Sequence, residues 1–135
     1  MCIRDRVIPL FINWLIEGKP PIVFGSGKQS RDFTFVGNVV QANMLAADAK
    51  GASGQSFNIA DGRAISLLDL IDQLQTQLGV EVPPDFQPPR KGDILHSMAD
   101  ITSATSVLGF EPKYDFEEGI KLSIDYYRSC VTQSV

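Results

Sequence analysis

The chain has few of the residues that make covalent or metal cross-links. It contains two cysteines, Cys2 and Cys130, near its opposite ends, and His96 is its single histidine. No Cys-x-x-Cys pair occurs. The sequence therefore predicts neither a disulfide framework nor a metal site, and this cysteine usage fits a reducing cytoplasm best.

Long runs of one residue type are missing as well. The net charge is -4 and no long run of lysine and arginine occurs, which argues against nucleic acid or an anionic membrane as the main partner. The apolar run at residues 7–16 contains Pro9 and Asn13, so it is too short and too polar to span a bilayer. It also lacks the small-residue cleavage pattern of a signal peptide. With 44% hydrophobic and 21% charged residues, the chain has the composition of an ordinary globular domain.

Two fingerprints of redox enzymes are also absent. No Gly-x-x-Gly-x-x-Gly pattern follows an expected strand, and no tyrosine is followed by a lysine four residues later. The first pattern binds a dinucleotide at the start of a helix. The sequence therefore assigns no residue of this chain to catalysis or to a bound cofactor.

The segment best suited to bind a ligand lies between two β-type runs, residues 22–24 and 33–36. Gly25 and Gly27 allow positive φ and a close approach of the backbone, so amides of this loop can face an anion. Arg31 stands near the second run, and its planar guanidinium suits two phosphate oxygens. An ordinary hairpin turn with a surface Arg-Asp pair explains the same residues equally well.

Apolar periodicity predicts several helices, at residues 7–16, 39–49, 67–78, 101–108 and 116–128. Ser66 and Asp69 resemble a capping box at the start of the third helix. A short strand is expected at residues 56–60, and extended runs are expected at residues 82–89 and 94–98. This mixture of elements indicates an α/β fold.

A second basic and acidic cluster runs from Arg90 to Asp93, after the proline-rich stretch. If the fold brings it close to Arg31, two guanidinium groups can clamp a diphosphate while the carboxylate accepts hydrogen bonds from a ribose. On spacing alone, a solvated turn after the proline-rich stretch is the favoured explanation of this cluster. For the single histidine, His96, a structural role is favoured over a catalytic one.

Several segments in order resemble the C-terminal half of an extended short-chain dehydrogenase/reductase, the NAD-dependent epimerase/dehydratase family. They are Val-Ile-Pro-Leu-Phe-Ile at 7–12, Phe-Gly-Ser-Gly-Lys-Gln-Ser-Arg-Asp-Phe at 24–33, Asn-Val-Val-Gln-Ala-Asn-Met-Leu-Ala-Ala at 38–47, Phe-Asn-Ile at 57–59, Arg-Lys-Gly-Asp at 90–93, His-Ser-Met-Ala-Asp at 96–100, Leu-Gly-Phe-Glu-Pro-Lys at 108–113 and Phe-Glu-Glu-Gly-Ile at 116–120. The similarity covers nearly everything after residue 6. It is greatest to bacterial UDP-sugar 4-epimerases.

The resemblance implies a role for five residues. Arg31 and Arg90 occupy the positions of the two arginines that clamp the nucleotide diphosphate. Asp93 falls where the family has a carboxylate that binds the ribose hydroxyls. The backbone of Ile22 and Phe24 lies where uracil is read, and the Phe24 ring forms an apolar wall beside it.

The resemblance also implies a domain organisation. Residues 7–135 are expected to form the nucleotide-sugar binding region of a Rossmann-type enzyme: a small substrate-binding α/β domain plus the last helix and strand of the cofactor domain. Residues 33–60 are expected to pack on a dinucleotide-binding domain that this chain lacks. Residues 1–6 read as a non-native start.

The complete enzyme is expected to be a cytoplasmic, homodimeric epimerase that binds NAD and a UDP-sugar. This chain alone is expected to bind no NAD and to be inactive, since the NAD-binding and Tyr-x-x-x-Lys parts are missing. Two alternatives remain open. One is a nucleotide-sugar dehydratase or reductase of the same family, and the other is a stand-alone, non-catalytic UDP-sugar binding module.

Two further expectations concern single positions. Gln29 is expected to shape the loop rather than to contact the ligand. Gly37 stands where many relatives have an acidic residue at a helix start, so this helix is expected to begin less firmly.

Overall fold

The computed structural model describes residues 6–132, and these fall into two units. The first unit holds the chain up to Gln29, Ser66–Leu95 and the chain from Ile120 on, and the second holds Ser30–Ile65 and His96–Gly119. Each unit is therefore assembled from segments far apart in the sequence. The first five residues of the expected non-native start, Cys2 among them, lie outside the described part.

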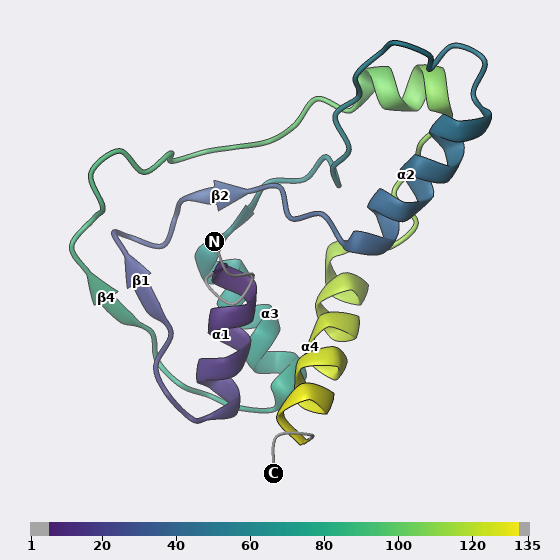
Figure 1. Cartoon of the computed structure of the whole chain (residues 1–135). Helices are drawn as coiled ribbons and strands as arrows, with labels where there is room; N and C mark the ends of the chain where they lie inside the picture. Colours follow the sequence, from purple (N-terminus) through teal and green to yellow (C-terminus); the bar gives the residue numbers. More distant parts are fainter. Residues whose placement is uncertain (1–5, 133–135) are drawn as a thin grey trace. The chain divides into compact units, whose positions relative to one another are not determined.

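The first unit combines two complete helices and most of a third with a pair of parallel strands (Figure 1). Helix α1 (Val7–Ile16) packs against α3 (Leu67–Leu78). Strand β1 (Ile22–Phe24) pairs in parallel with β4 (Asp85–Gln87). The side chains buried in this unit are mostly aliphatic: Phe11, Ile12, Leu15, Val23, Leu70, Ile71, Leu74, Ile120 and Ile124.

Helices α1 and α3 begin and end where the sequence predicts. The Ser66 hydroxyl accepts a hydrogen bond from the backbone N–H of Asp69 at 3.1 Å, and the Asp69 carboxylate accepts one from the N–H of Ser66 at 3.3 Å. These two bonds form the predicted capping box of α3. Gly79 ends α3 with a φ of 70°, a left-handed conformation that favours glycine.

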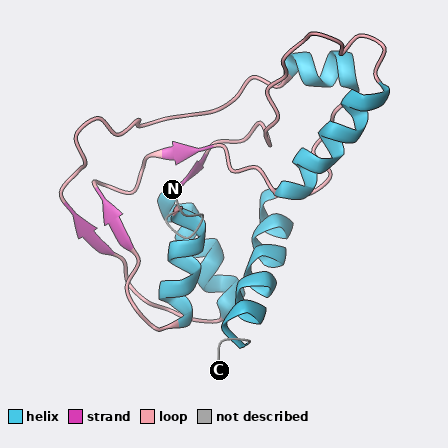
Figure 2. Cartoon of the chain, in the orientation of Figure 1, coloured by secondary structure: helices cyan, strands magenta, loops and turns pink. Residues whose placement is uncertain are grey.

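The second unit is built around α2 (Val36–Asp48) and a short π-helix, η2 (Ala104–Leu108), which pack together. Its core cluster consists of Ala42, Ala104, Leu108 and Phe110. Strand β2 (Ser30–Arg31) pairs with β3 (Ile65–Ser66). Helix α4 (Phe116–Thr132) begins in this unit and continues in the first. Figure 2 shows the helices in cyan and the strands in magenta.

A fully buried amide ties α2 to the chain before α4. The Oδ1 atom of Asn38 accepts hydrogen bonds from the backbone N–H groups of Lys113 and Tyr114, at 3.0 and 2.9 Å. Its Nδ2 atom donates to the carbonyl oxygen of Tyr114 at 2.8 Å. A buried amide without hydrogen-bond partners costs free energy, so the buried position of Asn38 depends on the backbone at Lys113 and Tyr114 staying in place.

The strand predictions need three corrections. The run at residues 33–36 is not a strand, because the chain is extended earlier, at β2, and α2 already begins at Val36. Residues 56–60 have no regular structure; a strand needs a hydrogen-bonded neighbour, and none pairs with them in the part of the chain that the structure describes. The hairpin alternative is also wrong, because β1 pairs with β4 instead of the strand that follows it.

Three helices differ from their predicted bounds at one or both ends. The helix expected at residues 39–49 starts earlier, at Val36, and its first turn has no side-chain cap. The helix expected at residues 101–108 winds as a π-helix from Ala104, and α4 continues to Thr132 rather than ending at residue 128. Helix ends are set by capping and packing, which apolar periodicity does not report.

Candidate functional site

Strand β1 offers backbone groups along one edge. Its ladder with β4 uses the carbonyl oxygen of Pro21, which accepts from the N–H of Asp85, and the N–H of Gly25, which donates to Gln87. In a parallel pair, successive residues direct their polar backbone groups to opposite edges. The backbone groups of Ile22 and Phe24 therefore lie on the edge away from β4, where a planar heterocycle with donors and acceptors can pair with them.

Gln29 supports this edge from the loop that follows β1. Its side chain is buried, and its Nε2 atom donates to the carbonyl oxygen of Phe24 at 2.7 Å. Its own carbonyl oxygen accepts from the N–H of Leu67 at 3.1 Å, and the carbonyl oxygen of Gly27 accepts from Leu68 at 3.2 Å. The loop is thus attached to the first turn of α3, which agrees with the expected shaping role of Gln29.

Arg90 lies over the ring of Phe24, with 3.8 Å between its Cζ atom and the ring centroid. This is a cation–π contact, in which the negative face of the ring attracts the guanidinium. A guanidinium over a ring face still directs its N–H groups sideways, where they can meet anionic oxygens. Pro89 and Gly25 also lie close together: a Cβ atom built on Gly25 would lie 3.6 Å from the Cβ atom of Pro89.

These groups open onto one cavity of about 380 Å³ within the first unit. Its lining includes four of the five predicted site residues: Ile22, Phe24, Arg90 and Asp93. The rest of the lining comes from α1, the loop, the start of α3 and the turn after Arg90: Val7, Leu10, Phe11, Trp14, Gln29, Leu67, Lys91 and Gly92. The cavity thus combines an apolar wall with a charged rim, which suits a ligand with a flat ring and an anionic group.

The fifth predicted residue, Arg31, belongs to the second unit. It is half-buried at the end of β2, and its Nη1 atom donates to the carbonyl oxygen of Ser30 at 2.8 Å. The convergence of Arg31 with Arg90 on one diphosphate stays a prediction. The neighbouring Asp32, which the hairpin alternative placed in a surface pair with Arg31, accepts hydrogen bonds from backbone amides.

His96 has a structural partner, as expected. Its Nδ1 atom lies 3.0 Å from the hydroxyl oxygen of Ser30, and the two residues form an isolated parallel bridge. Across residues 6–132, no group of three or more His, Cys, Asp and Glu side chains is placed to hold a metal ion. No helix in this range is long and apolar enough to cross a membrane.

Comparison with known proteins identifies the family. The family model described as GDP-mannose 4,6 dehydratase matches residues 3–123, which is most of the chain. The chain belongs to this epimerase/dehydratase family of extended short-chain dehydrogenases/reductases. Within that family it corresponds to the C-terminal part.

Three relatives of this epimerase/dehydratase chain illustrate the match. UDP-glucose 4-epimerase from Mycolicibacterium smegmatis is 35% identical over 91% of this chain and 39% of its own length. The structure of UDP-glucose 4-epimerase from Thermotoga maritima with UDP-glucose superimposes with a TM-score of 0.87, at 36% identity, over 93% of this chain and 40% of that one. UDP-glucuronic acid 4-epimerase from Bacillus cereus, solved with a fluorinated UDP-sugar and NAD, gives a TM-score of 0.88 at 27% identity, over 94% of this chain and 41% of that one. The chain therefore spans about two fifths of the length of these relatives.

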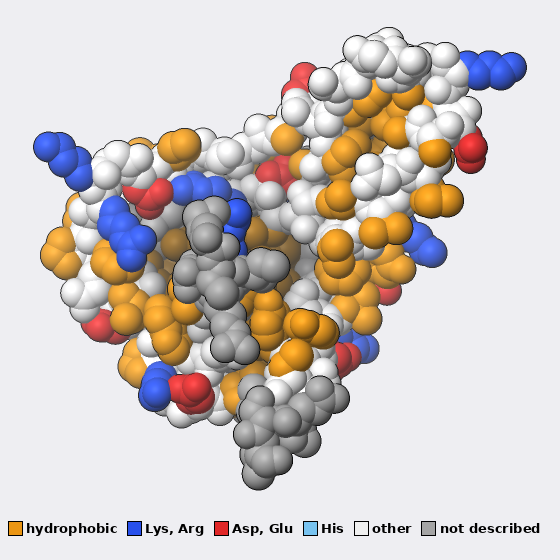
Figure 3. Space-filling model, viewed as in Figure 1, with side chains coloured by type: hydrophobic (Ala, Val, Ile, Leu, Met, Phe, Trp, Pro, Cys, Tyr) orange, Lys and Arg blue, Asp and Glu red, His pale blue; other side chains and the backbone are white. Residues whose placement is uncertain are grey.

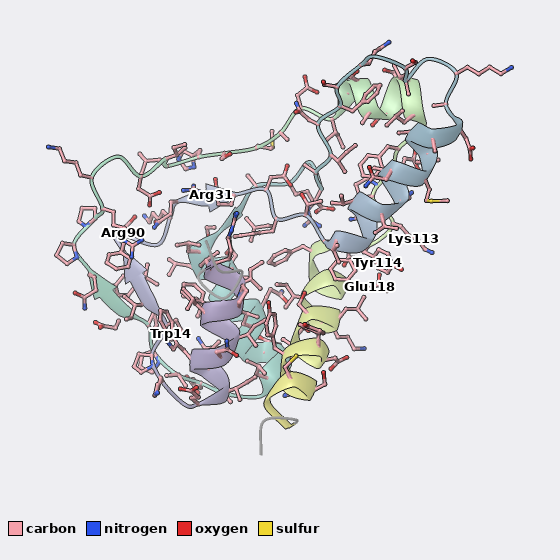
Figure 4. The ribbon with its side chains drawn as sticks, in the orientation of Figure 1. Trp14, Arg31, Arg90, Lys113, Tyr114 and Glu118 are labelled. Carbon is pink, nitrogen blue, oxygen red and sulfur yellow. The ribbon has the colours of Figure 1, made fainter. Side chains whose placement is uncertain are left out.

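One part of the cavity of this family member was missed from the sequence. The sequence predicted a helix at residues 7–16 and no ligand contact from it, yet Leu10 and Trp14 of α1 line the cavity. Trp14 is labelled in Figure 4. Leu10 and Trp14 lie on one side of the helix, together with Val7, because they are three and four positions apart. The sequence signal for this side of the cavity was a second apolar stripe on the helix, next to the buried stripe that contains Phe11 and Leu15.

Proposed function

We propose that this chain is the nucleotide-sugar binding part of an NAD-dependent UDP-sugar 4-epimerase, of the UDP-N-acetylglucosamine, UDP-glucuronate or UDP-glucose type. The observation that carries the proposal is the cavity into which Ile22, Phe24, Arg90 and Asp93 all open. The similarity to UDP-sugar 4-epimerases supports the choice of reaction.

In this proposal each lining group recognises one part of the nucleotide. The edge of β1 at Ile22 and Phe24 reads the uracil base, and the Phe24 ring lies beside it. The carboxylate of Asp93 accepts hydrogen bonds from the ribose hydroxyls. The guanidinium of Arg90 neutralises the diphosphate, and Arg31 supplies the second cation of the clamp.

Binding of the nucleotide part contributes to a reaction that takes place at the sugar part of the substrate. Binding energy from a non-reacting part of a substrate can be used to orient the reacting part. The residues of this chain do not suit NAD, because the glycine-rich pattern that holds a dinucleotide does not occur in the sequence. We therefore assign NAD and the acid-base tyrosine to the part of the enzyme outside this chain, and we infer no catalytic activity for the chain alone.

The proposal includes a dinucleotide-binding domain against which residues 33–60 pack. Helix α2 supports this part, because one of its faces is apolar yet exposed: Val36, Val40 and Met44, spaced four residues apart, are 64, 57 and 65% exposed. Figure 3 shows hydrophobic side chains gathered over this helix. Exposed apolar stripes of this kind mark surfaces that other protein covers.

The clamp is tested with Arg31→Ala and Arg90→Ala in the complete enzyme, by calorimetric titration with UDP. Each variant is expected to weaken binding by about 1.5–3 kcal/mol, the loss of a charge-assisted hydrogen bond, which is roughly a 10- to 150-fold rise in Kd. Arg63→Ala, which removes an exposed arginine outside the cavity lining, is the control and should leave the Kd unchanged. Unchanged affinity in both test variants would refute the diphosphate clamp.

Two other functions make different predictions. A dehydratase or reductase of the same family shares the nucleotide grip, and the matching family model is itself described as a dehydratase. Loss of water from the sugar, or net oxidation of reduced nicotinamide cofactor by the complete enzyme, would rule out an epimerase. A stand-alone binding module would give a monodisperse chain whose melting temperature rises with UDP, whereas the chain as part of an enzyme should be poorly soluble and show little response.

The coding sequence upstream of the chain separates these possibilities most directly. An in-frame strand, glycine-rich turn and helix, followed by Tyr-x-x-x-Lys, would support the enzyme. A genuine start site in its place would favour the binding module.

A further inference from the structure

The carboxylate of Asp32 joins three segments of the second unit. Its Oδ1 atom accepts a hydrogen bond from the backbone N–H of Asp61 at 3.0 Å. Its Oδ2 atom accepts from the N–H of Gly62 at 3.2 Å and from the N–H of Ala99 at 3.3 Å. Bonds from amides to a carboxylate are stronger than bonds between neutral groups. The backbone immediately after Arg31 is therefore held by two segments that lie 29 to 67 residues further along the chain.

The residue before Arg31 is held just as closely. Ser30 is 8% exposed. Its hydroxyl oxygen lies 3.0 Å from the Nδ1 atom of His96, and its carbonyl oxygen accepts from the N–H of Ser97 at 3.2 Å. The same carbonyl oxygen accepts from the Nη1 atom of Arg31 at 2.8 Å. The guanidinium thus lies against a backbone group that is itself fixed.

We propose that Asp32 is a positioning residue for Arg31, which it holds in the orientation needed to bind a diphosphate, with Ser30 as a second anchor. This inference rests on the proposed function, because it takes Arg31 to be one arm of the clamp. Long arginine side chains lose rotamer freedom when they bind. A backbone fixed on both sides, with the guanidinium already on a carbonyl, lowers that cost before the ligand arrives.

The hydrogen bonds of Asp32 also argue against direct contact between its carboxylate and the ligand. Both carboxylate oxygens already accept hydrogen bonds from backbone amides, so the group serves the fold of this loop rather than a ribose or a proton transfer. A purely structural role, in which Asp32 stabilises the unit without any effect specific to Arg31, is the competing explanation. A double-mutant cycle distinguishes the two.

The experiment measures the Kd of UDP by calorimetry for the complete enzyme and for the variants Asp32→Asn, Arg31→Ala and the double variant. Asparagine keeps the size of the side chain but presents an N–H₂ group to amide donors. We expect Asp32→Asn to raise the Kd about tenfold when Arg31 is present and to cause no further rise in the Arg31→Ala background. Asp100→Asn is the matched control: it removes the same charge from an exposed cap, and asparagine also caps well, so its Kd should equal that of the unchanged protein.

The outcomes separate this proposal from the clamp itself. Suppose first that Arg31→Ala alone weakens binding of UDP. If Asp32→Asn then raises the Kd equally in both backgrounds, or in neither, the positioning role is overturned and the clamp stands. If Arg31→Ala has no effect, this arm of the clamp fails and the positioning role fails with it.

A second variant covers the case in which Asp32→Asn does not fold. Ser30→Ala removes only the hydroxyl that contacts His96 and keeps the carbonyl oxygen that receives Arg31. A rise of about threefold in the Kd of UDP that disappears in the Arg31→Ala background supports the proposal. An unchanged Kd overturns it.

Discussion

Replacing Asn38 by alanine should destabilise the folded protein. The side chain is 0% exposed and makes three hydrogen bonds to the backbone of Lys113 and Tyr114, at 2.8 to 3.0 Å. The methyl side chain of alanine can form none of these hydrogen bonds. Lys113 is exposed and Tyr114 is half-buried, so water can reach part of what is lost, and about 1 kcal/mol per bond is a suitable value. The free energy of unfolding should therefore fall by about 3 kcal/mol.

Urea unfolding followed by circular dichroism measures this change. A shift of the midpoint at an unchanged slope reports a loss of stability rather than a change in the unfolded state. Asn43→Ala is the matched control, because Asn43 is exposed on the same helix and alanine has the higher helix propensity. Its free energy of unfolding should change by less than about 0.5 kcal/mol. The reasoning would be refuted if the two variants unfolded at the same midpoint.

A glycine pair and an acidic side chain provide two more predictions. Gly27 and Gly54 both have φ near +74°, but a Cβ atom on Gly27 would lie 2.8 Å from a leucine Cδ2 atom, whereas Gly54 has open space. Both alanine variants incur about 1–2 kcal/mol of left-handed strain, and Gly27→Ala should lose about 1–2 kcal/mol more in urea unfolding; equal losses would contradict the packing argument. Burial raises the pKa of the Asp61 carboxyl above its ordinary value of 3.8; the nearby charge of Arg63 lowers this pKa and that of Asp32 raises it. Ionisation of this carboxyl therefore costs more free energy in the folded state than in the unfolded state. The free energy of unfolding consequently falls as the pH rises through the pKa of the folded state. Asp61→Asn should therefore stabilise the protein at pH 7 and not below pH 3.8; an equal gain at both values would refute the burial argument.

Sequence periodicity predicted the helices well because their determinants are local. The apolar spacing of α1 gave its bounds, and the box made by Ser66 and Asp69 placed the start of α3. The strands were predicted poorly, since a strand depends on a distant partner. Nothing near Ile22 indicates that its partner is Asp85, and residues 56–60 have strand composition but pair with no strand within residues 6–132.

The site shows a similar division. Spacing alone left Arg90 and Asp93 as an ordinary turn, and only the family resemblance moved them to a ligand site; the structure places both beside Phe24 in one cavity. The contact of Trp14 with the cavity and the backbone hydrogen bonds of Asp32 were not predicted. Each depends on what a side chain touches across the fold, and a residue's type does not report that.

The pairing of β1 with β4 has a consequence for synthesis of the protein. Ile22 leaves the ribosome about sixty residues before its partner Asp85, and at about 5–20 residues per second this is a delay of roughly 3 to 12 seconds. During that time the strand that carries Phe24 has no partner in β4. The cavity lined by Phe24 and Arg90 is therefore completed only after β4 has been synthesised, late in translation.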